Sequence, residues 1–227
     1  MLVTAGKARY ATLTDWPITM DAPRNSLSSR ADGDRTKQNI LKAAEQLFVA
    51  QGVAATSMAE IAKQAGVTKS LIHHHYGSKQ ELWSAVKTVT MEDYGRRQQQ
   101  LMLDREPDLN LLEDSLIEYF RFMRDNPNVV RLWTWMSIEN DRQCAALSHE
   151  LTREGVDVTR RAQQAGYVRK DVEPEYILAQ FFALVRGWFL ERPVLQQIML
   201  QGASDEECDE RYLRATIRVF LDGLRPR

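Results

Sequence analysis

The feature that most constrains this fold is a series of short helical patterns, punctuated by glycines, in the N-terminal third of the chain. The first pattern begins near Arg35 and stops at Gly52, giving a predicted helix over 35–51. Its apolar positions recur at helical spacing on one face: Ile40, Leu41, Ala44, Leu47 and Phe48. A surface with this period has to pack against further helices.

Two shorter helices follow at once. Ser57 with Glu60 three residues later forms a capping box, which predicts a helix over 58–65 that Gly66 ends. Thr68 can cap a third helix running to about residue 76, and Ser78 can cap a fourth. Three helices with so short a turn between the last two describe a helix-turn-helix unit, whose third helix enters the DNA major groove.

The third helix divides into two arcs when residues are placed about 100° apart around its axis. One arc is expected to face the core and holds Leu71, Ile72, His75 and Tyr76. The other is expected to be exposed and holds Lys69, Ser70, His73 and His74. A cation, a hydroxyl and two imidazoles can bond base edges and phosphate oxygens, so the exposed arc is a candidate recognition surface.

The formal net charge of −1 conceals a difference between segments. Residues 35–80 carry six Lys/Arg against two acids, whereas residues 81–227 carry a net charge of −5. Chance clustering could produce so modest an excess. A local basic region would nevertheless attract nucleic acid whatever the global charge.

The rest of the chain also has helical patterns, so we expect an all-α fold. Residues 1–33, with Pro17, Pro23 and a Ser-rich stretch, show no sustained period and are expected to be a disordered, passive arm. We therefore predict three parts: this arm, a DNA-binding head over 34–80, and a helical body over 81–227. Further helices are expected over about 79–106, 112–126, 129–140, 142–165, 174–191 and 207–223.

The run over 35–86 resembles the N-terminal domain of TetR/AcrR-type transcriptional regulators. The shared elements are the Ile-Leu-x-Ala-Ala-x-x-Leu-Phe pattern at 40–48, Gly52, Thr56-Ser57, Ile61-Ala62, Ala65-Gly66-Val67, Thr68-Lys69, His75-Tyr76 and Ser78-Lys79-x-Glu81-Leu82. The resemblance implies phosphate contacts from Thr56 or Ser57, Thr68 and Lys79. It implies groove contacts from Lys69, Ser70, His73 and His74, beside Leu71. The chain departs from the family at His73, where a tyrosine is usual.

The body is interpreted by analogy with that family. The helices over 174–191 and 207–223 are expected to pair with their copies in a homodimer, since one short recognition helix reads too few bases. The expected dimer residues are Leu178, Phe181, Phe182, Val185, Phe189, Leu213, Ile217 and Phe220. Aromatic and Met residues are also expected to line a cavity for an unknown small-molecule effector, although a filled core is the alternative. The candidate effector residues are Tyr119, Phe122, Met123, Trp133, Met136, Glu139, Asn140 and Arg186.

These observations favour a ligand-responsive repressor that binds palindromic double-stranded DNA, over an enzyme or carrier that retains a helix-turn-helix and over a protein-binding adaptor. No nucleophile elbow, phosphate loop or metal-ligand spacing is present, so we expect no catalysis, cofactor or metal. The three consecutive histidines are not expected to form a metal site, because neighbouring residues on a helix point about 100° apart and no acidic or Cys partner is placed nearby. Cys144 and Cys208 suggest neither a disulfide framework nor a zinc cage. With no signal peptide or long apolar run, a cytoplasmic location is expected.

Overall fold

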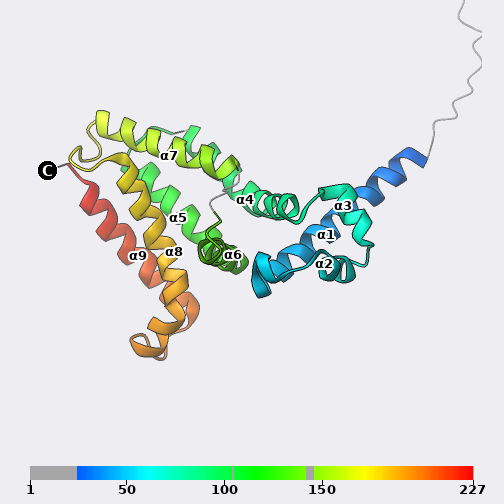
Figure 1. Ribbon diagram of the computed structural model, residues 1–227. Helices are drawn as coiled ribbons and strands as arrows, with labels where there is room; N and C mark the ends of the chain where they lie inside the picture. The colour runs from blue at the N-terminus through cyan, green and yellow to red at the C-terminus, as the bar shows by residue number, and fades with distance from the viewer. Residues whose placement is uncertain (1–24, 104, 142–145, 227) are drawn as a thin grey trace, which may run out of the picture. The chain divides into compact units, whose positions relative to one another are not determined.

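The computed structural model describes residues 25–103, 105–141 and 146–226, and within them the secondary structure is helical without a strand. The fold class is therefore all-α, as expected. The nine helices of these ranges are α1 (Asn25–Ala55), α2 (Met58–Ala65), α3 (Lys69–Tyr76), α4 (Lys79–Leu103), α5 (Leu109–Asp125), α6 (Pro127–Ile138), α7 (Ala146–Gln164), α8 (Pro174–Ile198) and α9 (Asp205–Leu224). Figure 1 shows their order along the chain.

The chain divides into two compact units, residues 1–36 and 37–227. In the first unit the described part is the beginning of α1, where Arg35 donates to the Asp32 carboxylate at 3.1 Å. Residues 25–33 are helical, whereas the sequence indicated an irregular arm. The apolar period could not reveal this stretch because its residues are mostly small, hydroxylated or charged. The expected arm over residues 1–24 lies outside the described residues.

The caps that the sequence predicted for the head are confirmed. Ser57 and Glu60 form a reciprocal capping box at α2, and Thr68 accepts the Leu71 N–H at α3. Ser78 likewise accepts the Glu81 N–H at 3.2 Å at the start of α4. Gly66 ends α2 with φ 68°, a left-handed conformation that glycine adopts without steric cost. The turn between α2 and α3 is thus fixed by local sequence.

The head has its own hydrophobic core, built from α1 to α4. Ile40, Phe48, Ile61 and Ile72 are fully buried there. The ring of Trp83 from α4 meets Phe48 edge-on, with centroids 5.3 Å apart. One buried member of this cluster comes from the body: Leu132 of α6 is 2% exposed and packs with the head residues.

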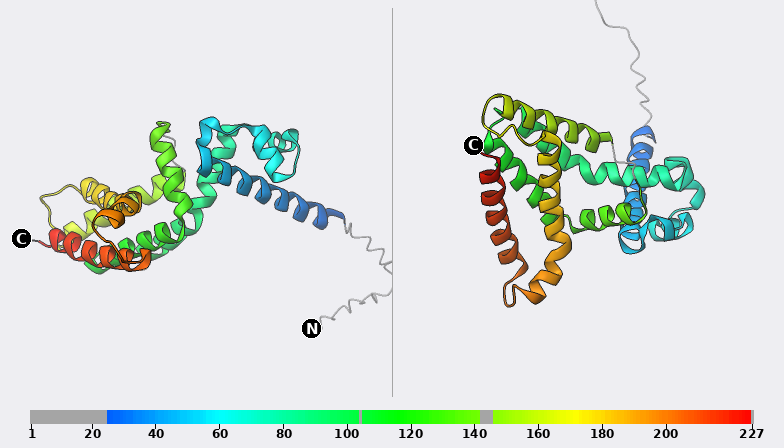
Figure 2. Two further views of the ribbon diagram at one scale, coloured as in Figure 1. Left: turned by 90° about the horizontal axis from the view of Figure 1, so that it is seen from below. Right: turned by 60° about the vertical axis from the view of Figure 1, so that its left-hand side comes forward.

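The body is formed by the rest of α4 and by α5 to α9. Figures 1 and 2 show α8 and α9 running side by side as a hairpin. Helix α4 packs against α5 and α7, while α5 packs against α8 and α9. Among the residues described, no helix is both long and apolar enough to cross a membrane.

Helix α8 continues seven residues beyond its expected end at 191, through Pro193 to Ile198. A proline inside a helix removes a backbone hydrogen bond, so such a position favours a helix end. Here polar contacts hold this last part of α8 to the start of α9. Arg192 donates to the buried Asp209 carboxylate at 2.8 Å, and the Gln196 amide donates to Asp205 at 2.9 Å. These tertiary contacts offset the loss of the backbone hydrogen bond at Pro193.

Candidate functional site

The exposed arc of α3 contains the four residues that the angular analysis predicted. Lys69, Ser70, His73 and His74 are exposed, whereas Ile72 on the opposite side is fully buried. The remaining inward residues, Leu71, His75 and Tyr76, are half-buried. The helix thus presents its polar side chains along one side, and its other side is fixed in the head core.

At the N-terminal cap of α3, the hydroxyl groups of Thr68 and Ser70 lie close together. The Thr68 hydroxyl accepts the Leu71 N–H at 3.3 Å and lies 3.0 Å from the Ser70 hydroxyl. His73 bonds through Nδ1 to the Gly77 carbonyl, so its Nε2 is the ring nitrogen left to face outward. Together with the N-cap Thr68, the arc therefore offers an ammonium, two hydroxyls and two imidazoles.

Two of the expected phosphate contacts have structural roles in the head. Thr56 is 1% exposed and its hydroxyl donates to the Gly52 carbonyl at 2.7 Å, so it is not available to DNA, whereas Ser57 is exposed. The burial of Thr56 contradicts its expected phosphate contact, whereas the contact expected of Ser57 stays a prediction. The Lys79 ammonium donates to the carbonyls of Val53 and Thr56 at 2.8 and 3.0 Å.

A third carbonyl, that of Ala54, lies 3.3 Å from the same Lys79 nitrogen. An ammonium has three donors, and these carbonyls end α1, where the helix dipole favours a cation. Lys79 therefore fastens the start of α4 to the end of α1. Its expected phosphate contact stays a prediction, and would require the ammonium to leave these carbonyls.

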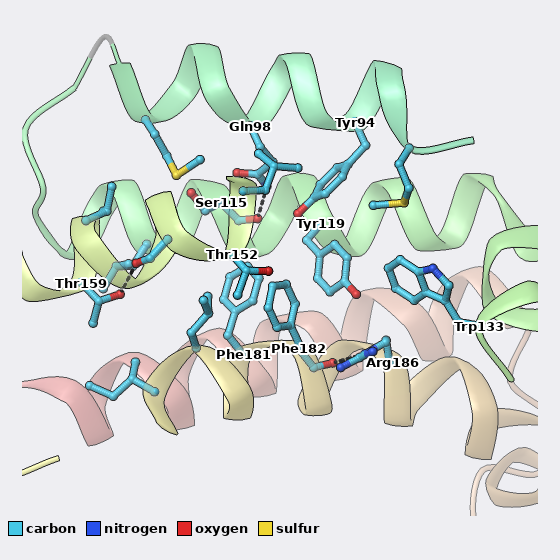
Figure 3. Close-up of a pocket in the computed structure, with 18 of the residues that line it drawn as sticks. Tyr94, Gln98, Ser115, Tyr119, Trp133, Thr152, Thr159, Phe181, Phe182 and Arg186 are labelled. Carbon is cyan, nitrogen blue, oxygen red and sulfur yellow. Dashed lines mark hydrogen bonds between the residues drawn. The ribbon is translucent and has the colours of Figure 1, made fainter. Parts of the chain in front are cut away.

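The body contains a largely apolar cavity of about 420 Å³, within the size range of small-molecule sites. Side chains of α4 to α9 line it, and Figure 3 shows them converging from helices that lie on opposite sides of the cavity. Four of the predicted effector residues are among the lining: Tyr119, Trp133, Met136 and Arg186.

The other four predicted effector residues lie elsewhere. Phe122 stacks on Tyr94 with centroids 4.6 Å apart, and Met123 is 1% exposed in the body core. Glu139 instead accepts the Ala54 N–H at 3.0 Å, and Asn140, with φ 51°, follows it in the chain. Neither Glu139 nor Asn140 lines the cavity. The concentration of aromatic and Met residues pointed to this part of the chain but could not tell which side of each helix meets the cavity.

A polar cluster at the head end of the cavity was missed by the sequence reasoning. Asp141 accepts hydrogen bonds from Trp83 Nε1 at 2.6 Å and from the Lys87 ammonium at 3.0 Å. Lys87 is 7% exposed, and both charged groups line the cavity. The sequence around Asp141 does not indicate this pairing, because Trp83 and Lys87 lie far from it along the chain. The cluster joins the cavity directly to Trp83 in the head core.

Burial contradicts three of the eight expected dimer residues, and the other five, which are partly exposed, stay a prediction. All eight pack into or against the body core, and Phe181, Val185 and Phe220 are 7%, 0% and 7% exposed within a single chain. Side chains buried in this way cannot meet a partner subunit. The large aliphatic side chains that do point outward from α8 and α9 are Leu190, Val194, Ile198 and Val219, each at least half exposed.

Among the described residues there is no group of three or more His, Cys, Asp or Glu side chains placed to hold a metal ion. Cys208 is a free, buried thiol, and Cys144 lies outside the described residues.

A family model described as bacterial regulatory proteins of the tetR family matches residues 40–86, the head. A second model, the Tetracyclin repressor-like C-terminal domain, matches residues 116–220 of the body. The chain belongs to the TetR family. The family is one of transcriptional regulators and not of enzymes, as the sequence led us to expect.

Individual relatives agree with the TetR assignment. The chain is 38% identical over 81 residues to the transcriptional regulator SrpR of Pseudomonas putida, covering 36% of this chain and 35% of SrpR. It is 26% identical to TtgR of Pseudomonas putida, covering 71% of this chain and 84% of TtgR. For three curated relatives the matched part spans only 31% to 55% of their own length.

A solved structure of a bacterial repressor shares the fold. SmeT of Stenotrophomonas maltophilia, described as the repressor of a multidrug efflux pump, superposes with a TM-score of 0.62 at 21% identity. The superposition covers 85% of this chain and 92% of SmeT. At this identity the likeness supports the fold alone.

Proposed function

We propose that this chain is a homodimeric, sequence-specific DNA-binding regulator, and that it is a repressor which a small-molecule effector releases from its operator. The observation that carries the DNA-binding part is the exposed arc of α3. Lys69, Ser70, His73 and His74 share the outward side of a capped helix whose other side is fixed in the head core. This is what a recognition helix needs to enter a major groove.

The effector part rests on the cavity and its connection to the head. Asp141 lines the cavity and bonds Trp83, whose ring contacts Phe48 in the head core. A ligand that favours one arrangement of this cluster would favour one placement of the head. Such differential affinity is the only way in which a ligand can shift a conformational equilibrium.

The dimer part rests on the outward stripe of α8 and α9. Leu190, Val194 and Ile198 recur every four residues along α8, and Val219 on α9 is 74% exposed. Exposed apolar residues aligned along a helix mark an interaction surface. Two copies of this helix pair would form a four-helix bundle.

The test is a titration of the purified chain on DNA from upstream of its own gene, over a range of salt concentrations, with the molecular mass measured in parallel. We expect saturable binding of a dimer to a short palindrome, with affinity that falls steeply as salt rises. Binding that shows no salt dependence, or no binding by a folded dimer, would reject the proposal in favour of a carrier or an adaptor.

Two variants locate the contact surface. Lys69→Ala should lower operator affinity by about tenfold, because a good base-edge contact contributes about 1–3 kcal/mol. Lys170→Ala is the matched control, since Lys170 is an exposed lysine in a loop of the body. Equal losses in the two variants would show that the α3 arc is not the recognition surface.

A further inference from the structure

One end of the cavity contains a buried phenol beside a guanidinium. Tyr119 is 1% exposed, stacks on Phe181 with centroids 5.6 Å apart, and meets Phe182 edge-on at 5.5 Å. Figure 3 shows its hydroxyl pointing toward the side of the cavity where Trp133 and Arg186 lie. This end of the cavity, formed by Tyr119, Trp133, Phe182 and Arg186, is called the anchor niche below.

The Tyr119 hydroxyl has no hydrogen-bond partner among the described residues. A buried hydroxyl without a partner is destabilising, and native structures contain few such groups. By contrast, the neighbouring Tyr94 hydroxyl is within hydrogen-bonding reach of Gln98. Burial raises the pKa of Tyr119, so its phenol stays protonated and is available as a donor.

Arg186 supplies the charge of the anchor niche. Its guanidinium lies 5.4 Å from the Trp133 ring centroid and 5.5 Å from that of Phe182. Its Nε donates a long hydrogen bond of 3.4 Å to the Phe182 carbonyl. Within the described ranges it forms no ion pair with a carboxylate. Two aromatic faces therefore orient a guanidinium whose terminal nitrogens are not engaged by an acid.

Three other polar side chains of the lining are already engaged. The Gln98 amide donates to the Ser115 carbonyl at 2.9 Å, and the Thr159 hydroxyl donates to Gly155 at 2.8 Å. The carboxylate of the lining, Asp141, is held by Lys87 and Trp83. A cationic ligand would have to compete for that carboxylate, whereas an anion would find Arg186 uncompensated.

We infer that this cavity takes an apolar monocarboxylate, whose carboxylate is held in the anchor niche by Arg186 and the Tyr119 hydroxyl while its apolar body lies among the aromatic and Met side chains. Arginine and a phenol are both donors, and a carboxylate is an acceptor with two oxygens to receive them. The inference rests on the proposed function, because it names the chemical class of the proposed effector.

The test uses three ligands with the same ring system and different head groups: naphthaleneacetate, naphthaleneacetamide and naphthylethylamine. Their binding to the full chain without DNA is measured by isothermal titration calorimetry. We expect the carboxylate to bind about tenfold more tightly than the amide, and the amine to bind most weakly. Equal binding of carboxylate and amide, tighter binding of the amine, or no binding of the carboxylate at millimolar concentration would overturn the inference.

Variants separate anchoring from general packing. Arg186→Gln should abolish the preference for the carboxylate over the amide, and Arg186→Lys should keep part of it. Arg153→Gln, an exposed arginine of α7 outside the lining, is the matched control and should leave the preference unchanged. A preference that persists in Arg186→Gln would remove Arg186 from the anchor niche.

Tyr119→Phe provides a second readout that a merely structural role would not produce. It removes a buried hydroxyl without a partner, so the melting temperature of the free protein should rise by about 2–4 °C. Carboxylate affinity should fall several-fold in the same variant. A variant that binds the carboxylate as tightly as the parent chain would exclude the tyrosine from the niche.

Failure of the inference and failure of the proposed function give different results. A chain that binds operator DNA but not the carboxylate contradicts the inference alone. A chain that binds the carboxylate through Arg186 but no DNA contradicts the proposed function.

Discussion

At the scale of single residues, Gly52 has the most demanding conformation in the head. Its φ of 82° interrupts the regular geometry of α1 before the helix ends at Ala55. A Cβ atom at this position would lie 2.8 Å from Glu139 Oε1 and 2.9 Å from Trp135 Cε3. The residue that allows α1 to end here also leaves room for two side chains of the body.

Gly52→Ala is therefore expected to destabilise the protein by about 2 kcal/mol or more, from backbone strain together with the steric clash. Urea denaturation measures the change. Gly33→Ala is the control, because nothing lies within 4 Å of a Cβ at that helical glycine, and alanine there should be neutral or stabilising. Similar losses in both variants would contradict the role assigned to Gly52.

His75 makes the stability of the head depend on pH. Burial lowers the pKa of this imidazole, and the positive charges of His74 and Lys37 lower it further. The folded state thus binds a proton less readily than the unfolded state. The contribution of His75 to folding stability is fully present above the unfolded-state pKa of about 6.5. It is lost as the pH falls from there through the lower folded-state pKa.

We expect the melting temperature to fall as the pH is lowered from about 7 to 5, and His75→Gln to reduce this dependence. Because the substitution can also alter packing, the comparison is of the slope with pH rather than of the stability itself. His73→Gln, at an exposed position, serves as the control. An unchanged slope in His75→Gln would contradict the assignment.

At the scale of elements, the sequence predicted which side of a helix faces inward where only one side of that helix is apolar. The inward and outward arcs of α3 and the caps of α2 and α3 follow from residues close together in sequence. Helix α8 is apolar over much of its circumference, so the sequence could not distinguish the side facing the cavity from the side facing solvent. The contacts of Lys79 could not be predicted for a different reason, because its partners are carbonyls 23 to 26 residues away in the sequence.

The pairing of α8 and α9 depends on a buried carboxylate. Asp209 is 2% exposed and accepts from Trp188 Nε1 at 2.6 Å and from Arg192 at 2.8 Å. Both donors belong to α8, close to Pro193. This acid therefore holds the helix together with its neighbour at the place where proline weakens it.

Asp209→Ala should destabilise the protein by about 2–3 kcal/mol, because it leaves the buried Trp188 Nε1–H without its acceptor and removes one of the two acids that pair with Arg192. Thermal or urea denaturation measures this loss. Asp205→Ala is a matched control, since that carboxylate also pairs with Arg192, at 3.0 Å, but its side chain is 68% exposed. We expect the control to lose less than about 1 kcal/mol. Equal losses would show that burial does not set the strength of this contact.

At the scale of the whole molecule, hydrogen bonds join the body beside the cavity to the head. Asp141 bonds Trp83 and Lys87, and Glu139 accepts from the backbone of Ala54. Trp135 Nε1 adds a hydrogen bond to the Val49 carbonyl at 3.3 Å. Most of these body residues come from the end of α6 and the turn after it, so this segment is the expected route by which a ligand affects the head.

Asp141→Asn tests that route. It keeps the size of the side chain but removes the charge that pairs with Lys87, so the effect of ligand on operator affinity should fall by about three- to tenfold. Operator affinity without ligand should change much less. Operator titrations with and without naphthaleneacetate give both quantities, and an unaltered ligand effect would exclude Asp141 from the route.

The presence of Leu132 in the head core has a practical consequence for protein engineering. A head excised after α4, or transplanted onto the body of a relative, would lose this buried side chain and the Met136 contact beside it. Deleting one buried leucine typically costs about 2–5 kcal/mol, a large part of the stability of a small domain. Functional chimaeras should therefore take α6 from the same parent as the head, although α5 stands between them in the sequence.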